Sequence, residues 1–326
     1  PGSEISEVEG RGNINNVSLD MDFNSSSPQK ETLAVKKWMK DFPFVLSATL
    51  NGGSISALYP YDYPPEGKYS TDDDDVFNEL ALTYAKEHMD MRNPDSCSDL
   101  DQYESGFVKT GGSYRPIKGS MMDFNYITHG CMEISFQISC HKFPFSSDLP
   151  DLWDDNKEPL LAFLGAVRMG VRGLVTDEEG NPVPNAKITI GGRESTVFRS
   201  TSRGEFWRLL RDNNYMLQVD AKGFSTKQQY ITVTNPTSDD EWPNTFNVTL
   251  YRPNTTTSTS TSTSTSSSTT SRTVPKVNLT KPTDNTEKDD ILDLASTSDV
   301  EAKSFPDWVL VVCSFVVTLN VLSHIL

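Results

Sequence analysis

Residues 44–62 read FVLSATLNGGSISALYPYD, and this stretch decides the fold of the first half of the chain. Its first seven residues are mostly apolar, which is typical of a strand buried within a sheet. Asn51, Gly52 and Gly53 follow directly, and these residue types favour a turn. The segment therefore predicts a buried strand that runs into a turn.

The segments on either side alternate between helical and strand patterns. Residues 31–41 place Leu33, Val35, Trp38 and Met39 on roughly one face of a helix. Further patterns predict a helix at 76–88, a strand at 134–139 and a short amphipathic helix at 159–167 that closes the unit. Together they predict an α/β domain over residues 1–167.

The acidic run at residues 72–75, DDDD, stands just before the second predicted helix. Carboxylates there complement the positive end of a helix dipole, so the run predicts a helix start. Calcium binding is the alternative, but no EF-hand loop follows the run. We therefore interpret it as the beginning of the helix.

The composition changes at Gly170, where short strand patterns separated by turns begin. GVRGLVTD, AKITIGG, STVFRST, YMLQVDA, QQYITVT and TFNVTLY are strand-like, whereas EEGNPVPN, SRGEF and KGFS are turn-like. This spacing predicts a small β-sandwich over residues 168–252. The segment has no His and no Cys, and we find no catalytic motif in it.

The composition narrows the classes of function. The chain has 326 residues, and its 45 acidic against 29 basic residues leave a net charge of −16. Nucleic-acid binding needs clustered Lys and Arg to neutralise phosphates, so the charge excludes that class. The chain has four cysteines, too few for a disulfide-dense mini-domain.

The last part of the chain has the composition of a surface anchor. Residues 255–271 are all Ser or Thr, so we expect a glycosylated stalk over 253–295. Small residues around Ser296, a polar spacer and the apolar residues 308–326 resemble a GPI-anchor signal over 296–326. We expect a lipid-anchored protein on the extracellular face of the plasma membrane; the alternative is a single C-terminal transmembrane helix.

Sequons and cysteines agree with the secretory route. Candidate N-glycosylation sites are Asn16, Asn24, Asn247, Asn254 and Asn278. In an oxidising compartment a bridge between Cys97 and Cys140 is expected. Cys131 is then left over, or its partner lies upstream of residue 1.

Five stretches carry a resemblance to a known family over residues 10–250. They are GRGNINNVSLDMDF, FVLSATLNGGSISALYPYD, DDDDVFNELALTYA, GSMMDFNYITHGCMEISFQISC and GVRGLVTDEEGNPVPNAKITI. In their order and spacing they resemble the regulatory (N/E) branch of the zinc metallocarboxypeptidases. The resemblance implies the C-terminal part of a mixed-sheet α/β carboxypeptidase domain, followed by a transthyretin-like sandwich.

The resemblance also implies a set of site positions. In the family, zinc is held by the His and Glu of an HxxE motif and by a later His, and a Glu acts as general base. HxxE occurs nowhere in this sequence, and we expect its place upstream of residue 1. The later His corresponds to Asn51 and the base to Gln137. An amide is a poor zinc ligand and cannot take a proton from water at neutral pH.

The substrate-binding positions are changed as well. Where the family has DLNRNF, residues 18–23 read SLDMDF, so Asp20 and Met21 replace the Asn-Arg pair that binds the terminal carboxylate. Arg115 stands at the place of the lid Tyr, with Tyr114 one position away.

Two positions keep the family residue. Arg11 matches the Arg of the GR motif near the scissile bond, and Asp62 matches the Asp that favours substrates ending in Lys or Arg. The Gln that accompanies this Asp is replaced by Met122.

Three functions fit these observations. The first is a catalytically inactive surface homologue that binds peptides with basic C-termini or other surface proteins, with no cofactor of its own. The second is an active zinc carboxypeptidase that releases C-terminal Lys or Arg. The third is a structural or adhesive module. His88, His129 and His141 lack the spacing of metal ligands, and we expect surface or capping roles, with His129 in a turn.

Overall fold

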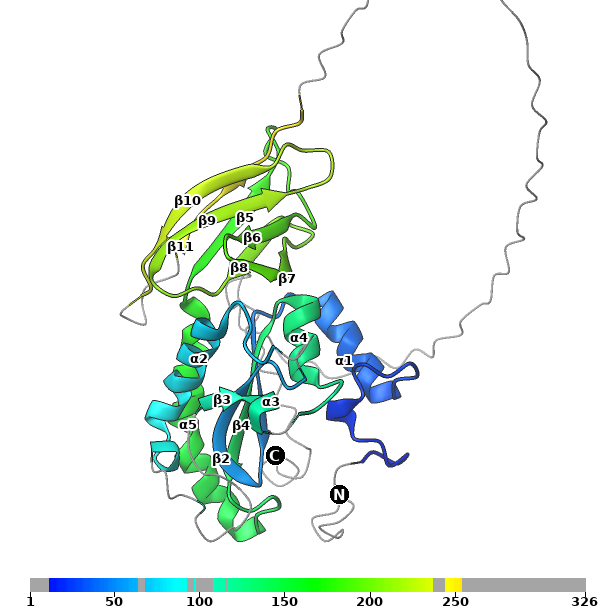
Figure 1. The fold of residues 1–326 in the computed structure, drawn as a ribbon, viewed down its shortest axis with the longest axis vertical. Coiled ribbons are helices and arrows are strands. Elements are labelled where there is room, and N and C mark those ends of the chain that lie inside the picture. The colour runs from blue at the N-terminus through cyan, green and yellow to red at the C-terminus, as the bar shows by residue number, and fades with distance from the viewer. Residues whose placement is uncertain are drawn as a thin grey trace, which may run out of the picture. The chain divides into compact units, whose positions relative to one another are not determined.

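The computed structural model describes residues 12–63, 68–92, 97, 108–114, 116–236 and 244–253. The described residues form a helix-and-sheet domain and a β-sandwich that belong to one compact unit (Figure 1). One apolar core cluster contains residues of both domains, from Leu46 in the first to Leu250 in the second. No helix among these described ranges has both the length and the apolar character needed to span a membrane.

The first domain is built on a mixed sheet of four strands in the order β1-β4-β2-β3. Its strands are β1 (Leu46–Asn51), β2 (Ser54–Tyr59), β3 (Val108–Thr110) and β4 (Met132–Ser139). β1 runs parallel to β4 and β2 antiparallel to it, while β3 is parallel to β2. The predicted strands therefore lie side by side at the centre of the domain.

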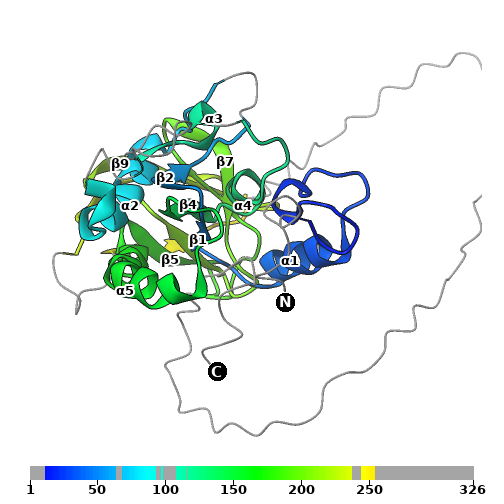
Figure 2. The ribbon, with the colours of Figure 1, turned by 90° about the horizontal axis from the view of Figure 1, so that it is seen from below.

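Helices cover both faces of this sheet. They are α1 (Lys30–Asp41), α2 (Asp74–Glu87), α3 (Gly111–Tyr114), α4 (Met121–His129) and α5 (Leu149–Gly165). Short 3-10 turns occur at Leu19–Met21, Asp90–Arg92, Ser146–Asp148 and Ala166–Arg168. α2 and α5 pack together on one face, and α1 and α4 lie on the other (Figures 1 and 2).

The second domain is a sandwich of two sheets. Its strands are β5 (Val171–Thr176), β6 (Lys187–Ile190), β7 (Arg193–Arg199), β8 (Glu205–Arg208), β9 (Asn213–Asp220), β10 (Lys227–Val233), β11 (Asn244–Thr245) and β12 (Val248–Thr249). One sheet has the order β10-β9-β6-β7, and in the other β5 pairs with β8, β11 and β12. Alternate residues of β9, such as Leu217 and Val219, are buried, as the strand patterns predicted.

Two local expectations were wrong. The helix expected at 159–167 is α5, which begins at Leu149, because Pro159, Leu160 and Phe163 continue a buried face through the proline. β8 begins inside the segment SRGEF that was assigned to a turn. The sequence of β8 does not show the usual alternation of apolar and polar residues, because Arg208 is one of its two inward-facing residues.

The histidines also differ from their expected places. His129 is the last residue of α4 rather than a turn residue. His88 is the C-cap of α2, in line with the expected capping role, but it is only 1 % exposed and stacks on Tyr84. His141 is exposed.

Candidate functional site

Polar side chains form two facing rows on β1 and β4. Because side chains alternate along a strand, every second residue shares a face. The parallel register pairs Ser47 with Glu133, Thr49 with Ser135, and Asn51 with Gln137. The expected zinc-ligand position and the expected base position are therefore direct neighbours on the two strands.

A serine joins the two amides at this place. The Nδ2 atom of Asn51 donates to the Oγ of Ser135 at 3.1 Å, and the Nε2 of Gln137 donates to the same oxygen at 3.1 Å. All three side chains are half-buried. The end of the row is thus an uncharged hydrogen-bonded group of two amides and a hydroxyl.

These residues do not fit a zinc ion. Zinc in proteins is bound by imidazole, thiolate or carboxylate groups, and Asn51, Ser135 and Gln137 supply none of them. Within the ranges that the structure describes, no group of three or more His, Cys, Asp or Glu side chains is placed to hold a metal.

Deeper in the same row lies a buried carboxyl group. Glu133 is 1 % exposed and accepts hydrogen bonds from Ser47 at 2.9 Å, from Thr49 at 2.7 Å and from the amide of Asn125. Burial raises the pKa of Glu133, while these three donors act against that rise. The group links β1, β4 and α4, so its role is to hold the floor of the site.

Asp62 lies beyond the end of β2, beside α3 and α4. Its carboxylate rests against Gly111, where an added Cβ would come within 1.8 Å of Oδ1. The methyl group of Met122 lies 3.1 Å from that Cβ position. The structure thus brings Asp62 and Met122 together, and only glycine leaves room for the carboxylate at position 111.

Asp123 holds the backbone of this segment in place. Its two carboxylate oxygens accept from the backbone N–H groups of Asp62 at 2.9 Å and Tyr63 at 2.8 Å. Asp123 is itself fixed by Ser120, whose hydroxyl accepts from the Asp123 N–H at 3.1 Å and caps α4. The segment that carries Asp62 is therefore held by the first turn of α4.

Burial raises the pKa of Asp62 to about 7, and the carboxylates of Asp123, Glu133 and Asp20 add to this rise. A hydrogen bond from Ser120 acts in the opposite direction. A carboxyl group in this state is poised to ionise when a cation arrives, because an opposite charge favours the charged form.

The loop with Asp20 and Met21 lies close enough to Asp62 for the Asp20 carboxylate to raise the pKa of Asp62. Leu19–Met21 forms a 3-10 turn in which Asp20 is exposed and Met21 is 42 % exposed. Asp22, next in the chain, is buried and accepts from Gln29 at 2.6 Å and Thr32 at 2.7 Å. Asp22 is therefore structural, whereas Asp20 and Met21 face solvent.

Several predicted residues lie outside the described ranges: Arg11, Arg115, Asn254, Asn278 and Ser296. The other sequon residues, Asn16, Asn24 and Asn247, are exposed. A disulfide joins Cys97 to Cys140 with Cα atoms 5.5 Å apart, and Cys131 is buried, with its Sγ 3.3 Å from the Oγ of Ser47.

Our reading of the sequence missed four residues of the site: Gly111, Ser120, Asp123 and Ser135. Ser135 had a signal, because Glu133, Ser135 and Gln137 are polar at every second position of an otherwise apolar strand. Ser120 also had one, since Ser followed three residues later by Asp123 is typical of a helix start. Gly111 had no local signal, because only the fold brings it to Asp62.

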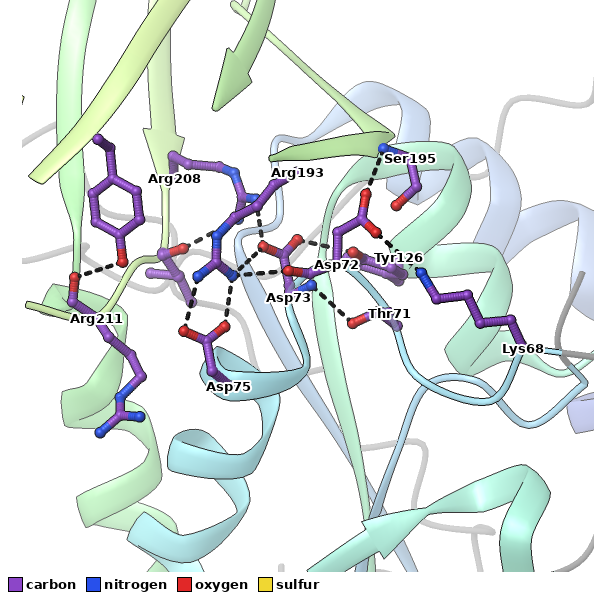
Figure 3. Close-up of polar contacts among 12 residues, drawn as sticks. Lys68, Thr71, Asp72, Asp73, Asp75, Tyr126, Arg193, Ser195, Arg208 and Arg211 are labelled. Carbon is purple, nitrogen blue, oxygen red and sulfur yellow. Dashed lines mark hydrogen bonds and ion pairs between the residues drawn. The ribbon is translucent and has the colours of Figure 1, made fainter. Parts of the chain in front are cut away.

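The acidic run has a partner that we did not predict. Arg208 is 1 % exposed and pairs with Asp73, which is also 1 % exposed, while Arg193 binds both oxygens of Asp75 at 2.6 and 2.8 Å. Figure 3 shows both guanidinium groups reaching from the sandwich strands to the start of α2. Tyr126 of α4 donates to Asp73 at 2.8 Å. The run forms the start of α2, as expected, although the helix begins at Asp74 and not at residue 76; the run also holds the two domains together.

Comparisons with known proteins agree with this architecture. Residues 7–159 match the zinc carboxypeptidase family, and residues 170–241 match the carboxypeptidase regulatory-like domain. Carboxypeptidase D of Drosophila melanogaster is 38 % identical over 244 residues, covering 69 % of this chain and 17 % of that protein. Carboxypeptidase M of Mus musculus is 36 % identical over 237 residues, covering 69 % of this chain and 53 % of that protein. Carboxypeptidase Z of Mus musculus is 38 % identical over 210 residues, covering 62 % of this chain and 32 % of that protein.

The order of the two domains is that of a zinc carboxypeptidase domain followed by a carboxypeptidase regulatory-like sandwich. The chain belongs to the zinc carboxypeptidase family, in its regulatory branch, as the resemblance predicted. It spans about half the length of carboxypeptidase M and less than a fifth of that of carboxypeptidase D.

Proposed function

We propose that this chain is a catalytically inactive member of its family that binds peptides with a basic C-terminal residue. The observation that carries the proposal is the pair of neighbouring amides, Asn51 and Gln137, both bonded to Ser135. Neither amide supplies a zinc ligand of the usual kind, and neither can act as a general base at neutral pH.

Binding is supported by Asp62. This carboxylate keeps the family residue type and lies against Gly111, with the methyl group of Met122 beside it. A Lys or Arg side chain that reaches this carboxylate replaces lost hydration with a charge-assisted hydrogen bond. A peptide with a terminal Lys or Arg is therefore the ligand that we propose for Asp62.

We also propose that the protein acts outside the cell, with a GPI anchor and N-linked glycans. The disulfide between Cys97 and Cys140 supports an oxidising compartment, since such bonds are rare in the cytosol. Release of the protein from cells by phosphatidylinositol-specific phospholipase C is the expected result. A membrane-bound product that resists this enzyme and still ends at Leu326 would contradict it.

The central test measures release and binding on the same protein, purified with its natural N-terminus. Incubation with zinc and a fluorescent peptide ending in Arg should release no arginine by mass spectrometry, while anisotropy detects binding. Asp62→Asn should weaken binding by at least about tenfold, the usual worth of a charged hydrogen bond. Glu87→Gln, an exposed charge removal on α2, is the matched control and should bind normally. Release of arginine that a zinc chelator blocks would overturn the inactivity.

A further inference from the structure

One sheet of the sandwich has a covered edge and an open edge. Its strand order is β10-β9-β6-β7, so β7 and β10 are the two end strands. The first domain covers β7, because α4 contacts this strand and the backbone N–H of Ser195 donates to Asp72 at 2.9 Å. Among the described residues, β10 pairs with β9 alone and lies beside it at the end of the sheet (Figure 1). The outer row of N–H and C=O groups on β10 is therefore open to a further strand.

The sequence of β10 lacks the features that usually protect such an edge. Edge strands are commonly blunted by charged side chains, by proline or by a bulge. Residues 228–235 read QQYITVTN, which contains no charge, no proline and no glycine, and the ladder with β9 is regular over all of Lys227–Val233. Tyr230, in the middle of the strand, is 81 % exposed. An uncharged edge rich in aromatic and β-branched residues favours pairing with another strand.

The outward side chains of β10 are already held in place by β9. The Nε2 of Gln228 donates to the Oε1 of Gln218 at 2.6 Å, and the Oγ1 of Thr232 donates to the Oδ1 of Asn214 at 2.6 Å. Both pairs stand directly across the β9–β10 ladder. A strand fixed in this way loses little conformational freedom when it pairs again.

The strand is complementary to a second copy of itself. When two copies pair in antiparallel direction around a two-fold axis at Tyr230, this tyrosine faces its own copy and Gln228 faces Thr232. These three residues share the outward face of β10, so the outward faces of the two copies join into one. The pairs that result, two aromatic rings and two sets of hydrogen-bonding groups, are favourable cross-strand neighbours.

The charges at the two ends of the strand match as well. Lys227 is exposed at the beginning of β10, and Asp212 is exposed beside its end, where its Oδ1 accepts from the N–H of Asn235 at 2.8 Å. Arg211, the cation next to Asp212, is paired with Glu79 at 3.5 Å. The two-fold axis brings Lys227 of each copy to the Asp212 end of the other, with Cα atoms about two strand spacings apart, ~10 Å. A lysine and an aspartate side chain together span that distance.

We propose that two copies of this chain associate through β10, as an antiparallel pair around a two-fold axis at Tyr230. The contact joins two four-stranded sheets into one sheet of eight strands. The charge pattern favours a second copy as the occupant, because the opposite charges at the two ends of β10 meet when the strand pairs with itself. The uncharged middle of the strand also lets two chains, each with a net charge of −16, approach each other with little repulsion.

Position 230 offers a direct test, because a residue on a two-fold axis meets its own copy. Tyr230→Cys is expressed in the full chain on intact cells, and oxygen with copper phenanthroline takes up the two electrons of disulfide formation. A disulfide-linked dimer should appear on a non-reducing gel, since directly opposite Cα atoms about 4.5–5.5 Å apart allow the bond. Tyr251→Cys replaces another exposed tyrosine of the sandwich and should stay monomeric. No dimer at position 230, equal cross-linking at position 251, or cross-linking of position 230 to a different protein would show the inference to be wrong.

Sedimentation equilibrium tests the same arrangement in solution. The whole protein in a mild detergent should show a monomer–dimer equilibrium. Tyr230→Lys puts two like charges opposite each other and should raise the dissociation constant of the dimer at least tenfold, whereas the control Tyr251→Lys should leave it unchanged. Lys227→Glu should also weaken the dimer, and adding Asp212→Lys, which exchanges the two charges, should restore it. A chain that stays monomeric, a dimer that Tyr230→Lys leaves intact, or an open-ended assembly would overturn the proposal.

Discussion

At the scale of single residues, Asp62 has the property that decides how the site responds to pH. Its pKa is raised to about 7, so about one tenth of the Asp62 carboxyl groups are ionised at pH 6 and about nine tenths at pH 8 when no ligand is bound. A cationic peptide needs the ionised form. We therefore expect its affinity to rise about tenfold from pH 6 to pH 8, measured by anisotropy. The profile of Asp62→Asn should be flat; a parallel rise in that variant would assign the titration to another group.

The same shift predicts a change in stability of opposite sign. Native Asp62 holds its proton between about pH 4 and pH 7, where the unfolded chain has released it. This group therefore lowers the free energy of unfolding as pH rises through that window. Asp62→Asn should be more stable than the wild type at pH 8, by roughly 1–3 kcal/mol, and closer to it at pH 4. Thermal unfolding at the two pH values measures this, and a variant less stable at pH 8 would contradict it.

Restoring single catalytic residues should not restore catalysis. Gln137→Glu gives a base with no metal-bound water beside it, and Asn51→His gives a ligand without a base. Even both changes leave Asp20 and Met21 at the clamp, which costs roughly 2–3 kcal/mol, or about a hundredfold in rate. Release of arginine by either single variant, followed by mass spectrometry, would show that our account of the site is incomplete.

At the scale of elements, the disulfide ties residue 97 to the end of β4. Cys97 and Cys140 are 43 residues apart, and a bridge over such a loop stabilises by limiting the unfolded chain. Changing both cysteines to alanine should lower the free energy of unfolding by about 2–4 kcal/mol. Urea unfolding measures this. Changing exposed Ser146 to alanine is a control expected to have little effect.

The elements also show what the sequence could and could not predict. β1 and β4 were predictable because apolar runs ending in turn residues have few other structures available. α5 was placed ten residues too late, because Pro159 looks like a helix start when its buried surroundings are unknown. Thr32 is buried in α1 while Leu33 is 50 % exposed, since Thr32 donates to Asp22. Such a contact between distant positions leaves no trace in local periodicity.

The site was likewise predictable only in part. Asn51, Gln137, Asp62 and Met122 came from the family resemblance, and the fold brings them together in two pairs. Asp123 and Gly111 depend on where the segment after β2 meets α3 and α4, which is a matter of tertiary structure. Their contribution could not be read from residue types alone.

At the scale of the whole molecule, one buried ion pair joins the two domains. Arg208 and Asp73 are both 1 % exposed, and removing one partner leaves an uncompensated buried charge. Arg208→Met should therefore lower the free energy of unfolding by about 3–5 kcal/mol. The double variant Arg208→Met with Asp73→Asn should recover part of this loss. Arg203→Met breaks an exposed pair with Glu205 and is the control, expected to cost less than about 1 kcal/mol.

Calorimetry checks that prediction and the cooperativity behind it. Because the apolar core cluster and the ion pairs are shared, the two domains should unfold in one transition. Two separated transitions in the wild type would show that the domains are energetically independent.

The shared core has a consequence for how this architecture can be recombined. Separating the chain between residues 167 and 168 divides the apolar cluster and leaves Arg208 without Asp73. If either domain is fused to an unrelated domain, that domain must supply both a matching apolar face and a buried acidic residue at the position of Asp73. We therefore expect the two domains to be kept together as one unit, both in natural gene fusions and in engineered chimeras.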